Sequence, residues 1–374
     1  MLSERTLDVG WSRLLKRFGQ EAGLEASAKR CGALVRRREI RKAGDLLRLA
    51  LAYGPCRMSL RSTAAWASIS GIAEMSDVAV LKRLQGCADW LETVAGELLA
   101  CRVGMTSWRR WGRVVRLYDA TTVSHPGSER ANWRLHATYD PEVGRLHDFE
   151  LTDDRGGETL KRARVSAGEI WVADRGLAHG GGLAHVVNHG ADFVVRIGWN
   201  SLALRTAAGR AFDLAARLAG LGSAASAQFH AQAVSDVGEI VPVRLLVWRK
   251  PPQEAAREIK RIRDKAARRG CKRGNGTPDP RSLVAARYII LASSLEAPAN
   301  QIFELYRLRW QIELAFKRLK SLLHFDELQA KHPELARTWL LAHLIAALVI
   351  DDHVTEALDT PPSAHRIAAS TASA

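Results

Sequence analysis

The sequence predicts an α/β protein, with an all-helical N-terminal region followed by a core that a mainly β insertion interrupts. Three observations support this prediction. Residues 1 to about 105 carry apolar residues at helical spacing. From about residue 113, short apolar runs alternate with helical segments, as they do in α/β cores. Between residues 200 and 285 this alternation stops and a basic segment appears, so we interpret 200–285 as an insertion.

The N-terminal region, residues 1–105, is predicted to be a helical DNA-binding region. The stretch 61–99 fits two helices around the turn at Ser70 and Gly71, with Ser76 as the N-cap of the second. This pattern is typical of a helix-turn-helix DNA reader. A small helical bundle that only packs fits it equally well.

The core is predicted in two parts, residues 110–199 and 286–330. The run "VVRLYD" reads as a strand that ends at Asp119, and "EIWVAD" as a buried strand that ends at Asp174. Between them, two strands joined across residues 141–144 form a predicted hairpin. The Gly-rich "HGGGLAH" that starts at His179 lacks a phosphate-loop pattern, so we expect a turn there. Residues 331–374 are expected to form a C-terminal helix and a disordered tail.

Composition indicates a polyanionic partner. Lys and Arg number 55 against 40 Asp and Glu, a formal net charge of +15, which favours nucleic acid. The longest apolar run, "WLLAHLIAALVI" at 339–350, is too short to span a bilayer, and the first residues contain no secretory run. Five scattered cysteines without C-x-x-C spacing fit a reducing compartment. We therefore expect a cytoplasmic protein with no membrane partner.

One acid stands out in the basic stretch "YRLRWQIELAFKRLK", residues 306–320. The stretch lacks Gly and Pro and is predicted to be one helix, which places Glu313 on the same face as several bases and a tyrosine. That face holds Tyr306, Arg309, Lys317 and Lys320. An amphipathic helix with a solvated charged face would give the same pattern.

Asp119, Asp174 and Glu313 together predict a metal site. Groups that follow strand ends line the ligand crevice of an open α/β sheet, although an Asp there can also be a simple turn former. Three carboxylates in one site repel one another unless cations neutralise them, and hard oxygen ligands select Mg²⁺ or Mn²⁺. Two such ions can activate a water or a 3′-hydroxyl and stabilise the leaving oxygen of a phosphodiester. Arg309, Lys317 and Lys320, beside Glu313, would hold phosphates next to that metal centre.

At this point the sequence resembles a known family. Tyr306, Arg309, Glu313 and Lys320 are spaced as Y-x₂-R-x₃-E-x₆-K, and "DATTV" and "ADRG" lie upstream around Asp119 and Asp174. This pattern is similar to that of the DDE-type insertion-sequence transposases, in the insertion-sequence-four group that includes the Tn-five-like enzymes.

The resemblance implies a ribonuclease H-like core and cut-and-paste excision followed by strand transfer, through a hairpin intermediate. It implies double-stranded DNA partners (transposon ends and target), a homodimer in the synaptic complex and a nucleoid-associated protein of bacteria. It assigns phosphate binding near a flipped base to Tyr306, Arg309 and Lys320. Trp248 is a candidate for stacking on that base, or an ordinary core residue.

The basic segment 257–273 contains Arg261, Arg268 and Arg269, which we expect to contact the DNA backbone. A solvated helix face is the alternative. Two further functions fit the same residues: a ribonuclease H-like nuclease that cleaves without joining, and a catalytically inactive DNA-binding derivative. Metal-dependent cleavage would exclude the second, and joining of a 3′-hydroxyl end would exclude the first.

Overall fold

The computed structural model describes residues 11–359, apart from residues 13, 17, 36–37, 101–108, 129–131 and 274–275. The chain divides into two compact units. We call Met1–Val103 together with Leu319–Ala374 the helical unit, and Gly104–Arg318 the sheet unit. Helix α12 (Trp310–Leu323) passes from the sheet unit into the helical unit.

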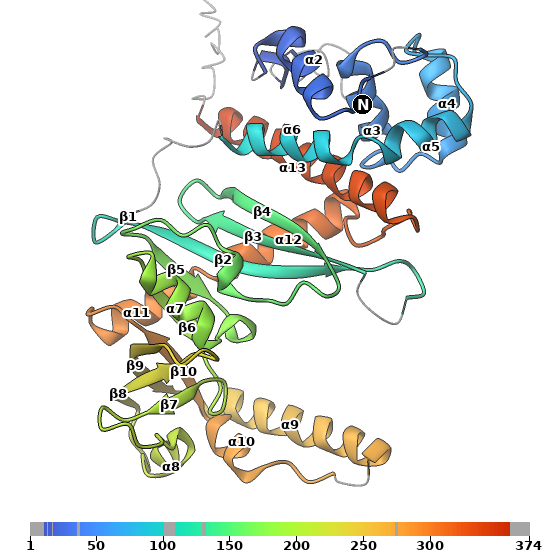
Figure 1. Ribbon diagram of the computed structural model, residues 1–374. Helices are drawn as coiled ribbons and strands as arrows, with labels where there is room; N and C mark the ends of the chain where they lie inside the picture. Colours follow the sequence, from blue (N-terminus) through green and yellow to red (C-terminus); the bar gives the residue numbers. More distant parts are fainter. Residues whose placement is uncertain are drawn as a thin grey trace, which may run out of the picture. The chain divides into compact units, whose positions relative to one another are not determined.

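The described elements of the helical unit are all helices. They are α2 (Gln20–Arg30), α3 (Ala43–Tyr53), α4 (Leu60–Ile69), α5 (Asp77–Gln85), α6 (Ala88–Ala100) and α13 (Pro333–Asp359), together with the end of α12 (Figure 1). The predicted N-cap is confirmed, because the Ser76 side chain accepts a hydrogen bond from the Ala79 backbone N–H at 3.2 Å. Ser59 caps α4 in the same way, through Ser62.

Helix α13 forms the core of the helical unit, as predicted. Its residues 333–352 are long and apolar enough to cross a membrane by length and composition alone, but 67% of that stretch is buried within the structure. Trp339 is fully buried and its ring lies 3.7 Å from that of His343. Gly54, at the end of α3, permits this packing, because a Cβ there would lie 2.9 Å from the Cβ of Ala342. We therefore interpret α13 as a core helix.

The sheet unit contains one large mixed sheet with the strand order β4-β3-β2-β5-β6-β10-β9-β8-β7 (Figure 1). The strands of its first half are β2 (Arg113–Val123), β3 (Trp133–Asp140), β4 (Arg145–Asp153), β5 (Ile170–Ala173) and β6 (Asp192–Arg196). The short strand β1 (Arg109–Arg110) pairs with β2. Strands β2, β3 and β4 are antiparallel, and β2, β5 and β6 are parallel. The predicted hairpin across 141–144 is confirmed as β3 and β4.

The strands of residues 200–285 continue this sheet. They are β7 (Ala203–Arg205), β8 (Ser226–Val234) and β9 (Ile240–Arg249), and β9 pairs with β10 (Tyr288–Ser293), which in turn pairs with β6. The same segment supplies α8 (Leu214–Ala219), α9 (Pro252–Arg273) and α10 (Pro280–Ala285). Thus the segment interpreted as an insertion extends the core sheet beyond β10.

One face of the sheet packs against α7 (Gly180–Asn188), and a core of Tyr118, Trp171, Phe193 and Val195 fills the space. The prediction of a turn at "HGGGLAH" was wrong, since the helix begins at Gly180. The glycines are required by packing. A Cβ on Gly180 would lie 2.4 Å from the backbone oxygen of Val234.

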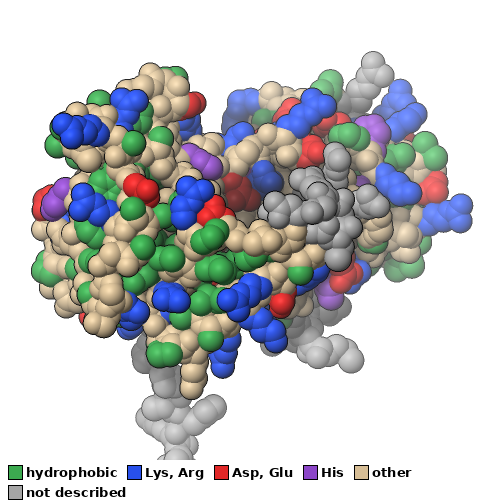
Figure 2. Space-filling model, turned by 90° about the horizontal axis from the view of Figure 1, so that it is seen from below, with side chains coloured by type: hydrophobic (Ala, Val, Ile, Leu, Met, Phe, Trp, Pro, Cys, Tyr) green, Lys and Arg blue, Asp and Glu red, His purple; other side chains and the backbone are tan. Residues whose placement is uncertain are grey.

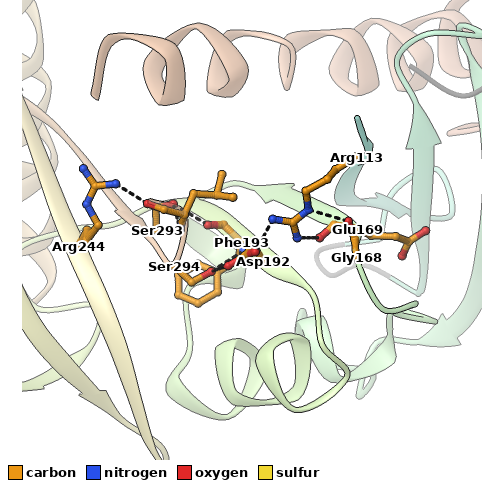
Figure 3. A network of polar contacts seen from close by, with 9 residues as sticks. Arg113, Gly168, Glu169, Asp192, Phe193, Arg244, Ser293 and Ser294 are labelled. Atoms are coloured by element: carbon orange, nitrogen blue, oxygen red, sulfur yellow. Dashed lines mark hydrogen bonds and ion pairs between the residues drawn. The ribbon is translucent and has the colours of Figure 1, made fainter. Parts of the chain in front are cut away.

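A polar network ties β2 to β6 and β10 (Figure 3). Arg113 donates to a carboxylate oxygen of Asp192 at 2.6 Å and to the backbone oxygens of Gly168 and Glu169. Asp192 also accepts from the hydroxyl of Ser294. These bonds fix the start of β6 against its neighbours.

Arg244 of β9 holds the connection between β10 and α11 (Ala299–Arg307), which leads towards the predicted site. It donates to the backbone oxygens of Leu295 and Ala297. Ser293 donates to the backbone oxygen of Phe193 at 2.9 Å. The entry into α11 is therefore anchored on both sides.

The stretch 306–320, predicted to be one helix, is broken. Helix α11 ends at Arg307 and α12 starts at Trp310, with Leu308 and Arg309 in a turn between them. The backbone N–H groups of Leu308 and Arg309 bond three residues back, as in a 3₁₀ turn. No Gly or Pro marks the break, so the sequence pattern does not show it.

Candidate active site

Asp119 and Asp174 lie on adjacent parallel strands, on the same face of the sheet. Strands β2 and β5 pair with Leu117 opposite Val172, so two residues further along, Asp119 comes beside Asp174. The predicted strand end at Asp119 was wrong, because β2 continues to Val123 along β3. Asp174 does follow the last residue of its strand, as predicted.

Arg309, in the turn between α11 and α12, is the hub of this site. Its Nη1 lies 3.7 Å from a carboxylate oxygen of Asp119 and 3.9 Å from one of Asp174. Its Nη2 lies 2.8 Å from an oxygen of Glu313. The three carboxylates predicted to share one site therefore surround one guanidinium, all within the sheet unit.

Tyr306, in the last turn of α11, also contacts this cluster. Its hydroxyl donates to Asp174 at 2.9 Å, and the Arg309 guanidinium carbon lies 5.7 Å from the centre of its ring. Burial, together with the neighbouring Asp174 carboxylate, raises the pKa of Tyr306 above its ordinary value, so the phenol keeps its proton.

The cluster contains more acidic than basic side chains. The pKa of Asp119 is raised to about 6, chiefly by burial. Asp174 and Glu313 also act to raise it, whereas the Ala120 N–H and Arg309 act to lower it. Burial alone would lower the pKa of Arg309, but the acidic neighbours outweigh it and the pKa is raised. A single guanidinium thus faces three carboxylates.

Arg309 does not satisfy the cluster by hydrogen bonding. Its Nε and Nη1 are buried and have no hydrogen-bond partner, and only Nη2 makes a short contact. Among the described residues, no group of three or more His, Cys, Asp or Glu side chains is arranged to hold a metal ion. Carboxylate oxygens, as in Asp119, Asp174 and Glu313, are the ligand type that suits Mg²⁺ or Mn²⁺.

Arg196, at the end of β6, is the neighbour of Asp174 on the other side, which the sequence prediction missed. Strands β5 and β6 pair with Ala173 opposite Val195, so the next position places Arg196 beside Asp174. The signal was present, because "DFVVR" is an apolar run that ends in a charged residue, like the runs before the two aspartates.

Arg196 also lines a cavity of about 210 Å³ bounded by β6, β10, α9 and α10. The other cations of the lining are Arg175, Lys250, Arg261 and Lys265, and its single acid is Glu258. Burial, reinforced by Arg196, lowers the pKa of Lys250. Lys and Arg also dominate the charged side chains of the face shown in Figure 2. This cavity suits an anion.

Two predicted phosphate contacts lie further along α12. Lys317 is exposed, four residues after Glu313. Lys320 is half-buried and belongs to the helical unit, so the geometry of the sheet unit does not place it. Trp310, beside Arg309, is 53% exposed, and the sequence analysis did not single it out.

The predicted DNA contacts within residues 200–285 differ in how exposed they are. Trp248 is 45% exposed on β9 and meets Phe303 of α11 edge to face, with ring centres 5.5 Å apart, so it is not a core tryptophan. Arg261 lies at the cavity and bonds Glu258 at 2.6 Å. Arg268 is exposed, and the side chain of Arg269 lies outside the described part of the structure.

Comparison with known proteins identifies the family. The model of the transposase DDE domain matches residues 110–349. The chain is 43% identical over 360 residues to the transposase InsL of insertion sequence element IS186A from Escherichia coli (strain K12), covering 94% of this chain and 96% of that protein. It is also 43% identical, over 361 residues and with the same coverage of both proteins, to the transposase for insertion sequence element IS421 from Escherichia coli.

Among solved structures, a piggyBac transposase synaptic complex with hairpin DNA aligns with a TM-score of 0.45 and 11% identity, over 91% of this chain and 68% of that chain. This similarity is too low to indicate a shared fold or function. The family match and the two relatives suffice: the chain belongs to the insertion-sequence transposases with a DDE domain, and it is a DNA transposase, an enzyme that cleaves DNA and transfers its strands.

Proposed function

We propose that this transposase excises its element by a cut-and-paste route with a hairpin intermediate, using Asp119, Asp174 and Glu313 to hold two Mg²⁺ or Mn²⁺ ions. The observation that carries this proposal is the convergence of the three carboxylates on Arg309. DDE transposases depend in general on divalent metals. The strand order β4-β3-β2-β5-β6 supports a ribonuclease H-like core. The spacing from Tyr306 to Lys320 supports the insertion-sequence-four group.

Ions held by Asp119, Asp174 and Glu313 would supply activation of the attacking water or 3′-hydroxyl and stabilisation of the leaving oxygen of the phosphodiester. The side chains of the protein position this site. Asp119, the most buried of the three carboxylates, fixes the site to the rigid middle of β2. Glu313 is 54% exposed and approaches from α12, on the side open to DNA. Tyr306 orients Asp174 through its hydroxyl.

The bases around the carboxylates would bind DNA phosphates. Arg309, Lys317 and Lys320 follow one another along the turn and α12, and Tyr306 precedes them. On the β9 side, Trp248 presents an exposed ring that a displaced base could stack on. Charge supports the assignments of Arg309, Lys317 and Lys320, and exposure supports those of Lys317 and Trp248.

Helix α9, within the segment 200–285, would extend this DNA surface. Arg261 and Lys265 line the cationic cavity, and Arg268 follows on the exposed side of α9. Arg269 continues the same run in the sequence. We therefore assign the backbone of double-stranded DNA to α9, for the transposon ends and the target. A homodimer in the synaptic complex and a cytoplasmic, nucleoid-associated location complete the proposal; the Escherichia coli relatives support the location.

The test is an assay with DNA that carries the ends of the insertion sequence, Mg²⁺ and a target plasmid. The parent should nick the ends, form hairpins on the released element and join 3′-hydroxyl ends to the target. Glu313→Gln should bind the DNA as the parent does and cleave it at least about 100-fold more slowly, the loss of roughly 3 kcal/mol of transition-state stabilisation. Cleavage at the parent rate by Glu313→Gln would remove the metal site, and cleavage without joining by the parent would leave only a nuclease.

A further inference from the structure

Arg309 occupies the position that neutralises the carboxylates when no metal is bound. It lies between Asp119, Asp174 and Glu313 and, among the described residues, is the one basic side chain paired with all three. A divalent ion held by the same oxygens would face a guanidinium at the same place, and two cations a few ångströms apart repel each other strongly in a partly buried site.

The fit of Arg309 to this position is incomplete. The distances to Asp119 and Asp174, 3.7 and 3.9 Å, are too long for hydrogen bonds. The Nε and Nη1 groups remain buried without partners, and the Arg309 side chain is only 12% exposed. Buried unsatisfied donors are costly, so the guanidinium gains by finding oxygens that reach those atoms. A phosphate, with several acceptor oxygens, offers this.

The backbone around Arg309 permits the exchange. The residue lies in the two-residue turn between α11 and α12, where 3₁₀-type bonds replace the regular helical ones. Turns of this kind inside helical stretches often mark hinges. The entry into α11 is anchored by Arg244 through Leu295 and Ala297, so a movement at the turn need not disturb it.

We infer that Arg309 is an exchangeable internal counter-ion: it closes the carboxylate site in the free protein and leaves it for a DNA phosphate, so that DNA and divalent metal bind cooperatively. The inference rests on the metal site proposed above and adds a regulation of that site. Its effect is to keep metal affinity low until DNA is in place. By linkage, metal must raise DNA affinity by the same factor that DNA raises metal affinity.

The first measurement is Mn²⁺ binding to the full-length protein without DNA, from the signal of free Mn²⁺ in electron paramagnetic resonance. Arg309→Gln should bind Mn²⁺ about tenfold or more tightly than the parent, since a competing charge is removed. Arg309→Lys keeps the charge and should stay within a few-fold of the parent. Circular dichroism melting in parallel establishes that each variant is folded.

The second measurement is the affinity for a fluorescein-labelled duplex that carries the element's end, with and without Mn²⁺, at constant ionic strength and before any cleavage. Mn²⁺ should raise the affinity of the parent by about the factor found in the first measurement, and that of Arg309→Gln by much less. This readout does not depend on turnover.

Asp119→Asn separates the two hypotheses. If it binds Mn²⁺ as the parent does, the proposed metal site is wrong and the counter-ion assignment falls with it. If Asp119→Asn loses Mn²⁺ binding while Arg309→Gln binds Mn²⁺ no more tightly than the parent, the metal site stands and Arg309 is not its counter-ion.

Discussion

Two clusters in the sheet unit have the same ingredients, one arginine among acidic side chains, yet differ in how completely their bonds are made. Arg116 of β2 donates to Asp140 at 2.7 Å and to Glu169 at 3.0 Å, and all three side chains are at least nine-tenths buried. Arg309 meets Asp119 and Asp174 only at longer range.

The remaining oxygens of the Arg116 cluster are also bonded. The second oxygen of Glu169 accepts from the Trp171 indole and the Ser166 backbone N–H. The second oxygen of Asp140 accepts from backbone N–H groups of the turn between β3 and β4. No atom of these three side chains is among the buried polar atoms of the described residues that lack a hydrogen-bond partner, so we interpret this cluster as structural.

The contrast shows which property separates a structural ion cluster from a functional one. Burial does not, because Arg309 is nearly as buried as Arg116, with 12% against 8% of the side chain exposed. The proportion of charges does differ, with three carboxylates around Arg309 and two around Arg116. What also differs is the presence of unbonded buried donors and of a carboxylate, Asp119, whose pKa burial raises to about 6. Such unmet bonds are the expected mark of a site completed by its ligands.

The largest expected effect comes from replacing one aspartate in each of the two clusters by asparagine. Asp119→Asn should lower DNA cleavage by about 10³-fold or more, roughly 4 kcal/mol, while the free energy of unfolding changes by less than about 1 kcal/mol. Asp140→Asn should do the opposite, destabilising the protein by about 3 kcal/mol because it breaks a buried pair. The measurements are single-turnover cleavage per folded molecule and urea unfolding. Equal loss of stability in both variants would end the distinction between the clusters.

The sequence was sufficient to single out three carboxylates, because apolar runs that lead into a charged residue are local signals. Two aspartates after apolar runs and a glutamate on a basic helix gave three carboxylates, and the structure places all three around Arg309. The central position of Arg309 could not be predicted, since it depends on the break between α11 and α12, which has no Gly or Pro.

Long-range pairing was also beyond the sequence. The strands of the segment interpreted as an insertion join the core sheet through β9 and β10, and nothing local specifies that partner. Likewise, the glycines of α7 look like turn residues until Val234 is seen against Gly180. Arg196 could have been found, because its apolar run, like those before the two aspartates, ends in a charged residue.

Removing the arginines is the second comparison. Arg116→Met leaves Asp140 and Glu169 buried without their cation, and should cost about 3–5 kcal/mol of stability. Arg309→Gln should cost about 1 kcal/mol or less, because Glu313 is 54% exposed and water can replace the guanidinium there. Urea unfolding of both variants without metal gives the two numbers. A loss of 3 kcal/mol or more in Arg309→Gln would make its cluster structural like the other.

A third kind of buried polar group, the neutral imidazole of His343, sharpens the comparison through pH. Burial lowers its pKa to about 4, with Arg57 and His324 also lowering it. Unfolded, the ring takes a proton near pH 6.5, so the stability it supports is complete above pH 6.5 and is lost as pH falls towards 4. The loss should reach about 1–3 kcal/mol.

The measurement is urea unfolding of the parent and His343→Gln at pH 7, 5.5 and 4.5. The parent should lose its advantage over the variant as the pH falls, since only its ring is protonated on unfolding. A difference between the two proteins that stays constant across this range would show that His343 titrates alike in both states.

The smallest expected effect concerns α9, where Arg261, Arg263 and Arg268 are exposed. Arg261 and Arg268 lie seven residues apart and therefore on the same side of the helix, whereas Arg263 points to the opposite side and is equally exposed. If α9 follows the DNA backbone, Arg261→Ala with Arg268→Ala should lower the slope of log K against log salt by up to about two units, and Arg263→Ala should leave it unchanged. Between 0.1 and 0.2 M salt this corresponds to only about a fourfold difference in affinity. Fluorescence anisotropy with a labelled duplex measures it. Equal slopes for the double variant and the parent would mean that the charges of α9 are solvated rather than bound to phosphates.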